Sequence, residues 1–262
     1  MNPALGISRT GMHAFQNAMD TISYDIANVN TTAYKGRQSE FETLLTNAIT
    51  TPENLTIEIS SGSRNEVSAL NMQQGSLTAS EGEFQLAISN SIRREADGSD
   101  AWVENNNFFQ VIGVDGGTYY TRDGNFRMDE SSTIVNSRGE QLTFERITNV
   151  PLSLSASYSV QNDGSVYQIE GDTQIQIGRI PVYLVNPDEL IAVGENKFVL
   201  ADGATAVQDN NATVLQGYLE NSNVDLATRF TDMMVVQRAY AMNVKAAQSA
   251  DEMMSMINQF KQ

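Results

Sequence analysis

The chain has 262 residues, with 32 acidic and 16 basic side chains and a formal charge of -16. This length allows one large domain or two smaller ones, and the negative charge disfavours binding to nucleic acids and to anionic membrane surfaces, because it repels phosphate groups. The sequence contains no cysteine, which excludes disulfides, thiolate nucleophiles and sulfur-ligated zinc sites.

Neither a membrane span nor a secretion signal is predicted. No apolar run approaches the roughly 18 residues that a membrane span needs, and the longest candidate, Ile180 to Val185, contains Pro181. Polar residues such as Arg9, Asn17 and Asp20 interrupt every apolar stretch near the N-terminus, unlike the apolar region of a signal peptide. We therefore expect no membrane insertion and, if the protein leaves the cell, export without a cleaved signal peptide.

The N-terminal residues predict an amphipathic helix over residues 3–27. Asn2 can cap this helix, and Pro3 fits its first position, where no backbone N–H is needed. The apolar residues follow the alternating steps of three and four that define a heptad seam, interrupted at Ser8. The residues of this seam are Leu5, Met12, Phe15, Met19, Ile22, Ile26 and Val29.

The C-terminal residues predict a second, longer helix with a looser seam. Ser222 and Asp225 fit a capping box just before it, and neither glycine nor proline occurs from Val224 to Gln262. The two seams either pack within one molecule or pair and then bind neighbouring copies. The principal residues of the second seam are Leu226, Phe230, Met233, Val236, Tyr240, Val244, Met254 and Ile257.

Between the helices the sequence predicts a β-rich body, so the expected fold class is α+β with a central, mainly antiparallel β domain. Asp-Gly pairs, at 115–116, 123–124, 163–164 and 202–203, separate short runs of aromatic and β-branched residues and are typical of β-hairpins. Residues 39–49 give a helical signal. The predicted domains are a terminal helical assembly domain, a short helix with an extended connector, and an outer β domain, over residues 1–35 plus 216–262, 36–80 and 81–215.

No catalytic, cofactor or metal site is predicted. His13, the only histidine, lies next to a seam position of the first helix and is more typical of an exposed side chain than of a catalytic triad. Glu81 and Glu83 could serve a glycosidase, but such pairs arise by chance among 32 acidic residues. Residues 97–100 lack the spacing of a calcium-binding EF-hand, and residues 115–117 precede a predicted strand rather than the helix of a dinucleotide site. We therefore expect a protein that is not an enzyme.

Four groups of residues, in matching order over nearly the whole chain, resemble the bacterial flagellar rod and hook protein family. They are residues 27–35, residues 108–111 with 120–126, residues 186–187 with 194–196, and residues 217–226 with 237–240 and 250–253. Length and the 222–226 block are more similar to the distal rod member than to the longer hook member, with the proximal rod member as the near alternative. The motif residues are Asn28, Asn30, Thr31, Thr32, Tyr34, Lys35, Ser222, Asn223, Asp225, Gln237, Arg238 and Tyr240.

The resemblance implies a structural subunit that self-assembles into a hollow helical tube, which transmits torque from motor to hook. It implies that the two terminal helices form a coiled coil in the innermost layer of the tube and that the β domain faces outward. The implied partners are copies of this chain, other rod and hook proteins and the flagellar type III export apparatus, in a basal body outside the cytoplasmic membrane. A monomeric secreted binding or adhesin protein and a carboxylate-dependent glycosidase remain the alternatives.

Three departures from the family pattern affect local structure. Ala33-Tyr34 stands where the family commonly has Gly-Phe, so a turn that depended on glycine at positive φ must be built differently. Arg229 takes a place that is often acidic, and residues 89–104 resemble an insertion.

Overall fold

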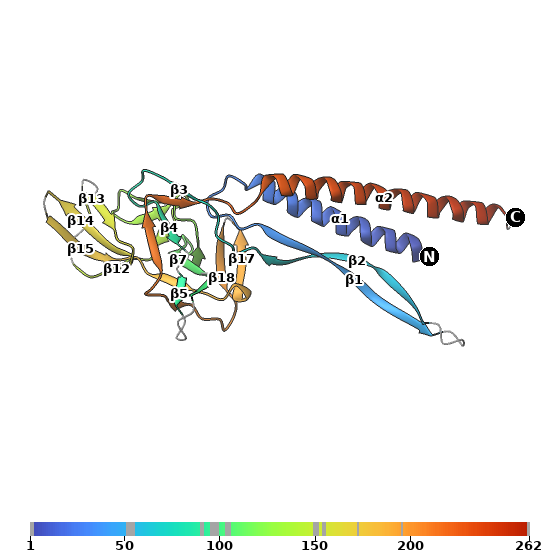
Figure 1. Ribbon diagram of the computed structural model, residues 1–262, viewed down its shortest axis with the longest axis horizontal. Helices are drawn as coiled ribbons and strands as arrows, with labels where there is room; N and C mark the ends of the chain where they lie inside the picture. The colour runs from blue at the N-terminus through green and yellow to red at the C-terminus, as the bar shows by residue number, and fades with distance from the viewer. Residues whose placement is uncertain are drawn as a thin grey trace. The chain divides into compact units, whose positions relative to one another are not determined.

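The protein is described from a computed structural model (Figure 1). It forms two compact units, one of residues 1–28, 37–70 and 224–262 and the other of residues 29–36 and 71–223. Among the described residues no helix is both long and apolar enough to cross a membrane. The structure describes residues 3–50, 56–89, 92–94, 100–102, 106–148, 152–153, 156–171, 173–194 and 196–260.

The first unit contains both terminal helices, α1 (Pro3–Ala27) and α2 (Leu226–Gln259), which confirms the two predicted helices. They run antiparallel and side by side, with the start of α1 and the end of α2 at the same end of the unit (Figure 1). A long hairpin of β1 (Arg37–Thr50) and β2 (Thr56–Leu70) packs against α1. Coiled-coil geometry between the helices stays a prediction.

The short helix expected at residues 39–49 is wrong, because these residues lie in β1. The expected extended connector likewise contains β2, which pairs antiparallel with β1 over nearly its whole length. Phe41, Leu44 and Leu45 have helical spacing, but they alternate with the β-branched residues Thr43 and Thr46, which favour strands. The pairing with the next strand decided the structure, and residues 51–55 between the two strands contain no Asp-Gly pair that would indicate a hairpin.

The second unit is built from short strands, and every strand pairing described in it is antiparallel, as predicted. In chain order its elements are β3 (Leu77–Ala79), β4 (Leu86–Ser89), β5 (Ile92–Arg94), β6 (Asp100–Trp102), β7 (Asn107–Ile112), β8 (Thr118–Thr121), β9 (Phe126–Met128), β10 (Ile134–Asn136), β11 (Gln141–Leu142), β12 (Glu145–Arg146), β13 (Ser157–Val160), β14 (Ser165–Glu170), β15 (Thr173–Arg179), β16 (Val182–Leu184), a 3-10 turn (Pro187–Glu189), β17 (Leu190–Gly194), β18 (Lys197–Leu200), β19 (Val207–Gln208), β20 (Thr213–Gln216) and β21 (Tyr218–Glu220).

These strands form one large sheet, one smaller sheet and several pairs. The nine-stranded sheet has the order β17-β18-β8-β7-β11-β10-β9, with β16 on β7 and β19 on β16, and the four-stranded sheet has the order β12-β15-β14-β13. The pairs β20–β4 and β21–β3 join the end of the unit to its beginning. Strands β5 and β6 pair within the segment that resembles an insertion.

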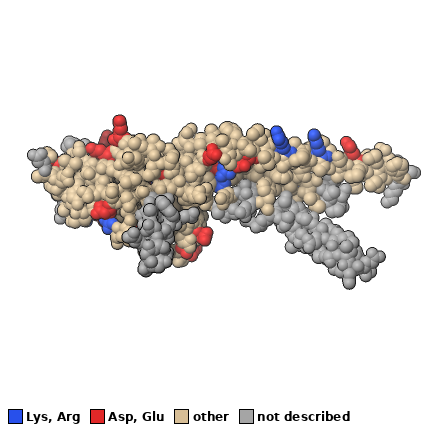
Figure 2. Space-filling model, viewed as in Figure 1, with Lys and Arg blue, Asp and Glu red and all other residues tan. Residues whose placement is uncertain are grey.

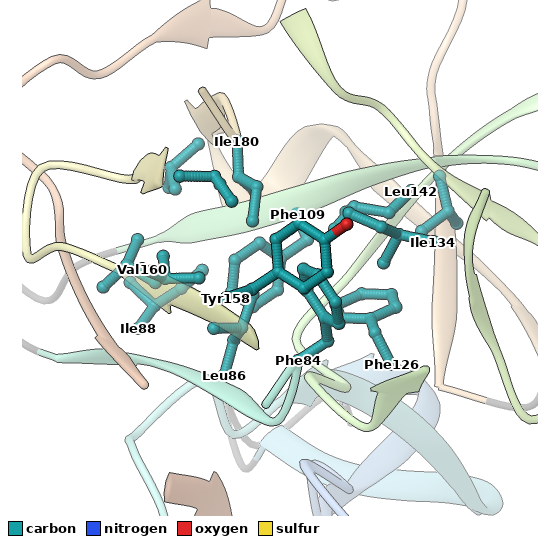
Figure 3. Close-up of a cluster of buried hydrophobic side chains, with 14 of the residues drawn as sticks. Phe84, Leu86, Ile88, Phe109, Phe126, Ile134, Leu142, Tyr158, Val160 and Ile180 are labelled. Atoms are coloured by element: carbon teal, nitrogen blue, oxygen red, sulfur yellow. The ribbon is translucent and has the colours of Figure 1, made fainter. Parts of the chain in front are cut away.

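One hydrophobic core holds the strands of the second unit together (Figure 3). Phe109 of β7 meets Phe126 of β9 edge to face at a centroid distance of 5.6 Å, a favourable aromatic geometry. The cluster also includes side chains from β4, β13, β14, β15 and β20, such as Leu86, Val166 and Val214. Because a single cluster includes side chains from both sheets and from the β20–β4 pair, these strands depend on one another for burial.

The Asp-Gly pairs have two different structural roles. Gly116 (φ 79°) and Gly164 (φ 81°) lie in the β7–β8 and β13–β14 hairpins, which confirms those predictions. The hairpin prediction is wrong for residues 202–203 and 123–124, because the strands on either side of each pair take other partners. At Gly124 an added Cβ would lie 1.6 Å from the carbonyl oxygen of Leu86. Glycine is needed there because two backbones approach closely.

Replacing glycine by alanine at the two kinds of site should separate these roles. Gly124→Ala should lower the free energy of unfolding by at least about 2 kcal/mol, since a backbone must move to admit the methyl group. Gly116→Ala meets open space at positive φ and should cost only about 1 kcal/mol. Urea unfolding of both variants measures the difference, and equal losses would contradict the close-approach explanation.

Candidate functional site

The helix pair of the first unit meets through small side chains on α1. The buried residues Ser8, Gly11, Ala14 and Ala18 recur at steps of three and four, so they share one face. The side-chain amide of Asn243 donates a hydrogen bond to the carbonyl oxygen of Ser8 at 3.1 Å, and a Cβ on Gly11 would lie 2.3 Å from the same nitrogen. This polar contact between closely packed helices favours one register.

The large apolar residues of the two predicted seams flank this small-residue face. Ile22 and Val236 are buried with Ala18, while Phe15, Met19, Ile26 and Met233 are partly buried around them. Leu5 belongs to α1, but its side chain lies outside the described residues. The role of the seam residues in assembly stays a prediction. Half-buried are Met12, Val29, Tyr240 and Val244, and exposed are Leu226, Phe230, Met254 and Ile257.

A buried carboxylate joins three elements of the first unit. Asp25, near the end of α1, is completely buried and forms an ion pair with Arg229 of α2 at 3.1 Å. Asp25 also accepts a hydrogen bond from the backbone N–H of Arg37 at 3.2 Å, and Arg229 donates to the carbonyl oxygen of Arg37 at 3.1 Å. The unusual arginine at 229 therefore has a defined partner.

The first family motif is part of the second unit. The Thr32 hydroxyl donates to Asp123 at 2.9 Å, and the Asn196 side chain donates to the carbonyl oxygen of Thr32 at 2.8 Å. The backbone N–H of Ala33 donates to the carbonyl oxygen of Glu220 at 2.7 Å. Residues 29–36 thus belong with the β strands, whereas the predicted boundary grouped residues 29–35 with the helices.

The motif ends in a buried cluster of two cations and one carboxylate. Lys35 Nζ lies 2.6 Å from Glu220 Oε1, and Arg122 Nη1 lies 3.2 Å from Glu220 Oε2. All three side chains are at most 2% exposed. Burial lowers the pKa of Lys35, and the charge of Glu220 partly opposes that effect. Because one carboxylate compensates two buried cations, Glu220 has the most consequential charge of this Lys35–Glu220–Arg122 cluster.

Backbone groups complete the hydrogen bonding of this cluster. Lys35 also donates to the carbonyl oxygen of Gln73 at 2.7 Å, and Glu220 accepts from the N–H of Gly75 at 3.1 Å. Arg122 donates through Nε to the carbonyl oxygen of Asn107 at 2.9 Å. The buried charges therefore have the partners that a low-dielectric site requires.

Asn223, from the second family motif, joins three passages of the chain. Its side-chain oxygen accepts from the N–H of Gly36 at 2.8 Å. Its side-chain nitrogen donates to the carbonyl oxygens of Asn71 and Gln73 at 2.7 and 2.9 Å. An asparagine suits this position because it is both a donor and an acceptor.

Asp225 caps α2, whereas the expected capping box gave that place to Ser222. Its carboxylate accepts from the N–H of Ala227 at 3.1 Å and from the hydroxyl of Thr228, which is the pattern of an N-cap. These hydrogen bonds, led by the one from Thr228, lower the pKa of Asp225. The N-cap of α2 is therefore Asp225, the residue directly before the helix.

The remaining motif residues make local contacts or lie on the surface. The Asn28 side chain donates to the carbonyl oxygen of Tyr24 at 2.8 Å, at the end of α1. Tyr34 is buried, and Asn30, Gln237 and Arg238 are exposed. Half-buried are Thr31, Ser222 and Tyr240.

Ala33 lies in the left-handed region, with φ 54°. The expectation that the turn must be built differently without glycine is therefore wrong. The alanine keeps a positive φ, which for a residue with a Cβ costs about 1–2 kcal/mol. The buried N–H bond to Glu220 and the packing of Ala33, which is 3% exposed, hold it there.

The sequence reasoning missed the partners that complete these contacts. Glu220 and Arg122 stand inside segments that resemble the family, and a charged side chain within or directly after a strand was the available signal. Asp25 and Asn243 lie beside the seam residues Ile26 and Val244. In each case the sequence shows a polar residue next to an apolar pattern but does not show which distant residue pairs with it.

The residues considered for catalysis and metal binding do not form a cluster of metal ligands in the described part of the chain. In that part of the chain no group of three or more His, Asp or Glu side chains could hold a metal ion. His13 is exposed on α1, and Glu81 and Glu83 are exposed as well. Residues 97–100, whose spacing does not fit a calcium-binding EF-hand, lie largely outside the described residues.

Comparison with known proteins gives matches along the whole chain. Three family models match parts of the chain. The model described as flagella basal body rod protein matches residues 5–35, and the model described as flagellar hook protein FlgE/F/G D1 domain matches residues 102–168. The model described as flagellar basal body rod FlgEFG protein C-terminal matches residues 215–260. The chain is 30% identical to the flagellar basal-body rod protein FlgG of Buchnera aphidicola subsp. Acyrthosiphon pisum, over 99% of this chain and 100% of the relative. It is 30% identical to FlgG of Borreliella burgdorferi, over 100% and 99%, and 31% identical to FlgG of Bacillus subtilis, over 95% and 94%.

Substitutions in the buried cluster should reveal its charge imbalance. Glu220→Gln leaves two buried cations without a carboxylate and should lower the free energy of unfolding by about 3–5 kcal/mol. Lys35→Met leaves the Arg122–Glu220 pair balanced and should cost about 1 kcal/mol. Urea unfolding measures both. A loss for Lys35→Met equal to that for Glu220→Gln would contradict this account.

Glycine substitutions should reveal the strain at Ala33. In Ala33→Gly, relief of about 1–2 kcal/mol of backbone strain should offset the lost methyl burial and the greater freedom of the unfolded chain, together about 1–2 kcal/mol. Ala87→Gly, at a completely buried position of β4 without positive φ, offers no relief and should cost about 1–2 kcal/mol. Urea midpoints compare the two, and equal losses would argue against strain.

Proposed function

The chain belongs to the flagellar basal-body rod protein family, and we infer from this that it is a structural subunit of the rod in the bacterial flagellum. Membership implies assembly with other rod and hook proteins in the basal body. We further propose that copies of the chain assemble with one another into a hollow helical tube that transmits torque from motor to hook. Contacts between different surfaces of identical copies generate such an open polymer when the rotation does not close a ring.

The apolar surface of α2 is the observation that best supports self-assembly. Large apolar side chains stand exposed along the whole helix, among them Phe230, Met234, Met242, Met256 and Ile257, and such surfaces mark interaction sites. Of the -16 formal charge of the chain, α2 contributes nothing, since it has three basic and three acidic residues. Figure 2 shows both blue and red side chains along α2, in agreement with this balance.

We propose that the two units have different positions in the tube. The helices of the first unit would form the inner, coiled-coil layer of the tube, because they combine exposed apolar side chains with little net charge. The second unit has its own core and most of the strands, and it would face outward. In this proposal residues 29–35 and 216–223 of the predicted terminal domain belong to the outer body.

We also propose export through the flagellar type III apparatus to a site outside the cytoplasmic membrane. Export of this kind needs an unfolded chain. The fold supports export in the unfolded state, because contacts between the first and last parts of the second unit complete it. Lys35 forms an ion pair with Glu220, β3 pairs with β21, and β4 pairs with β20. The second unit therefore cannot be completed until nearly all of its sequence has emerged.

Locating the protein in purified basal bodies tests the proposed function. In the native organism, Met233→Asp should abolish swimming and lower the amount in basal bodies at least about tenfold, a loss equivalent to about 1.4 kcal/mol. The substitution puts a charge into the partly buried helix contact. Val114→Asp, at an 86% exposed site, is the control and should leave both unchanged. Absence of the wild-type protein from basal bodies, or normal swimming with Met233→Asp, would contradict the proposal.

A further inference from the structure

The C-terminal end of α2 extends beyond α1. Asn243 already contacts Ser8, near the start of α1, and α2 continues to Gln259 (Figure 1). At 1.5 Å per residue, the helical part that follows Ala250 is roughly 13 Å long. Residues 251–257 are all exposed. We call residues 251–260 the overhang.

The overhang continues the seam that covers α1. Along this seam Tyr240 and Ala247 are half-buried and Ala250 is buried, whereas Met254 and Ile257 are 37% and 61% exposed. Met253, Met256 and Phe260 add exposed apolar surface. A helix seam that is covered for most of its length and then left open indicates a partner that supplies the missing face.

The first unit also contains a groove, at a different position along the helix pair. It has a volume of about 460 Å³ and is lined by residues of α1, β1 and α2. Ile22 and Val236 are buried there, while Phe41 and Val235 are 46% and 60% exposed. The ring of Phe41 packs on Phe15 at a centroid distance of 5.3 Å. The groove thus offers apolar surface that is held in place but not covered.

We propose that the overhang of one copy docks into this groove of a second copy. This inference rests on the proposed function and specifies one contact of the polymer. Val235 in the groove and Met256 in the overhang lie on the same rigid helix, about 30 Å apart at 1.5 Å per residue. One copy therefore cannot fill its own groove. The contact joins two different surfaces of identical chains, so it propagates from copy to copy.

Charge and flexibility favour a second copy as the occupant. The overhang has two acidic residues, Asp251 and Glu252, and no basic residue, which disfavours insertion into an anionic membrane. Arg229 also lines the groove, but Asp25 and Asp232 already compensate its charge, so the groove suits a mainly apolar helix end. The unbranched methionines of the overhang can adapt to the shape of the groove.

Disulfide trapping tests this contact directly, because the chain contains no cysteine. In the full-length protein, Ile257→Cys combined with Val235→Cys should give a ladder of linked copies when isolated basal bodies are oxidised. Each single variant should stay monomeric. A mixture of the two single variants should give dimers only, since one copy then supplies the overhang cysteine and the other the groove cysteine.

Control positions make the result decisive. Ile257→Cys with Met242→Cys, exposed on α2 but outside the groove, should give no ladder, and Ile257→Cys with Gln38→Cys, across the groove, should give one. If the variants enter basal bodies and neither groove pair gives a ladder, the docking is overturned but the rod function stands. If a double variant does not enter, the purified full-length single variants are mixed and oxidised, and absence of the dimer overturns the docking. Absence of the wild-type protein from basal bodies overturns the function itself.

Discussion

The buried carboxylate of Glu220 is the constraint on which the second unit depends. It compensates Lys35 from the first family motif and Arg122 from the β core, and it binds the N–H of Gly75. A site with two cations and one anion, closed to water, is stable only while its anion is in place. The residues that meet there are up to 185 positions apart in sequence. The cluster therefore ties the beginning, middle and end of the unit into one cooperative structure.

Polar anchors also fix the places where the chain enters and leaves each unit. In the second unit, Gly36, Asn71 and Asn223 are joined by hydrogen bonds. In the first unit, Arg37 and Arg229 are joined through Asp25. The chain passes between the units several times, and these residues lie directly beside three of the crossings.

Periodicity predicted the helices and hairpin chemistry predicted much of the β unit, because both are local properties. The hairpin of β1 and β2 was missed because the residues between its strands, 51–55, lack the Asp-Gly pair that marks the other hairpins. Glycine at 124 was misread because a close approach to Leu86 leaves the same dipeptide signature as a turn. At Ala33 the tertiary contacts overrode the backbone preference of the residue. The ion cluster could not be predicted, since a charge in a strand indicates that a partner exists but not which one.

The helix seams show why a correct pattern still gave an incomplete picture of the site. The sequence analysis centred the first seam on large apolar residues, but the closest contact uses Ser8, Gly11 and Ala18. Small residues let the two helices approach closely, which leaves the large side chains at the sides of the contact, partly covered. A contact of that kind leaves part of the apolar surface of both helices uncovered. In the proposed polymer the uncovered surface would contact neighbouring copies, so the same residues would stabilise both the subunit and the polymer.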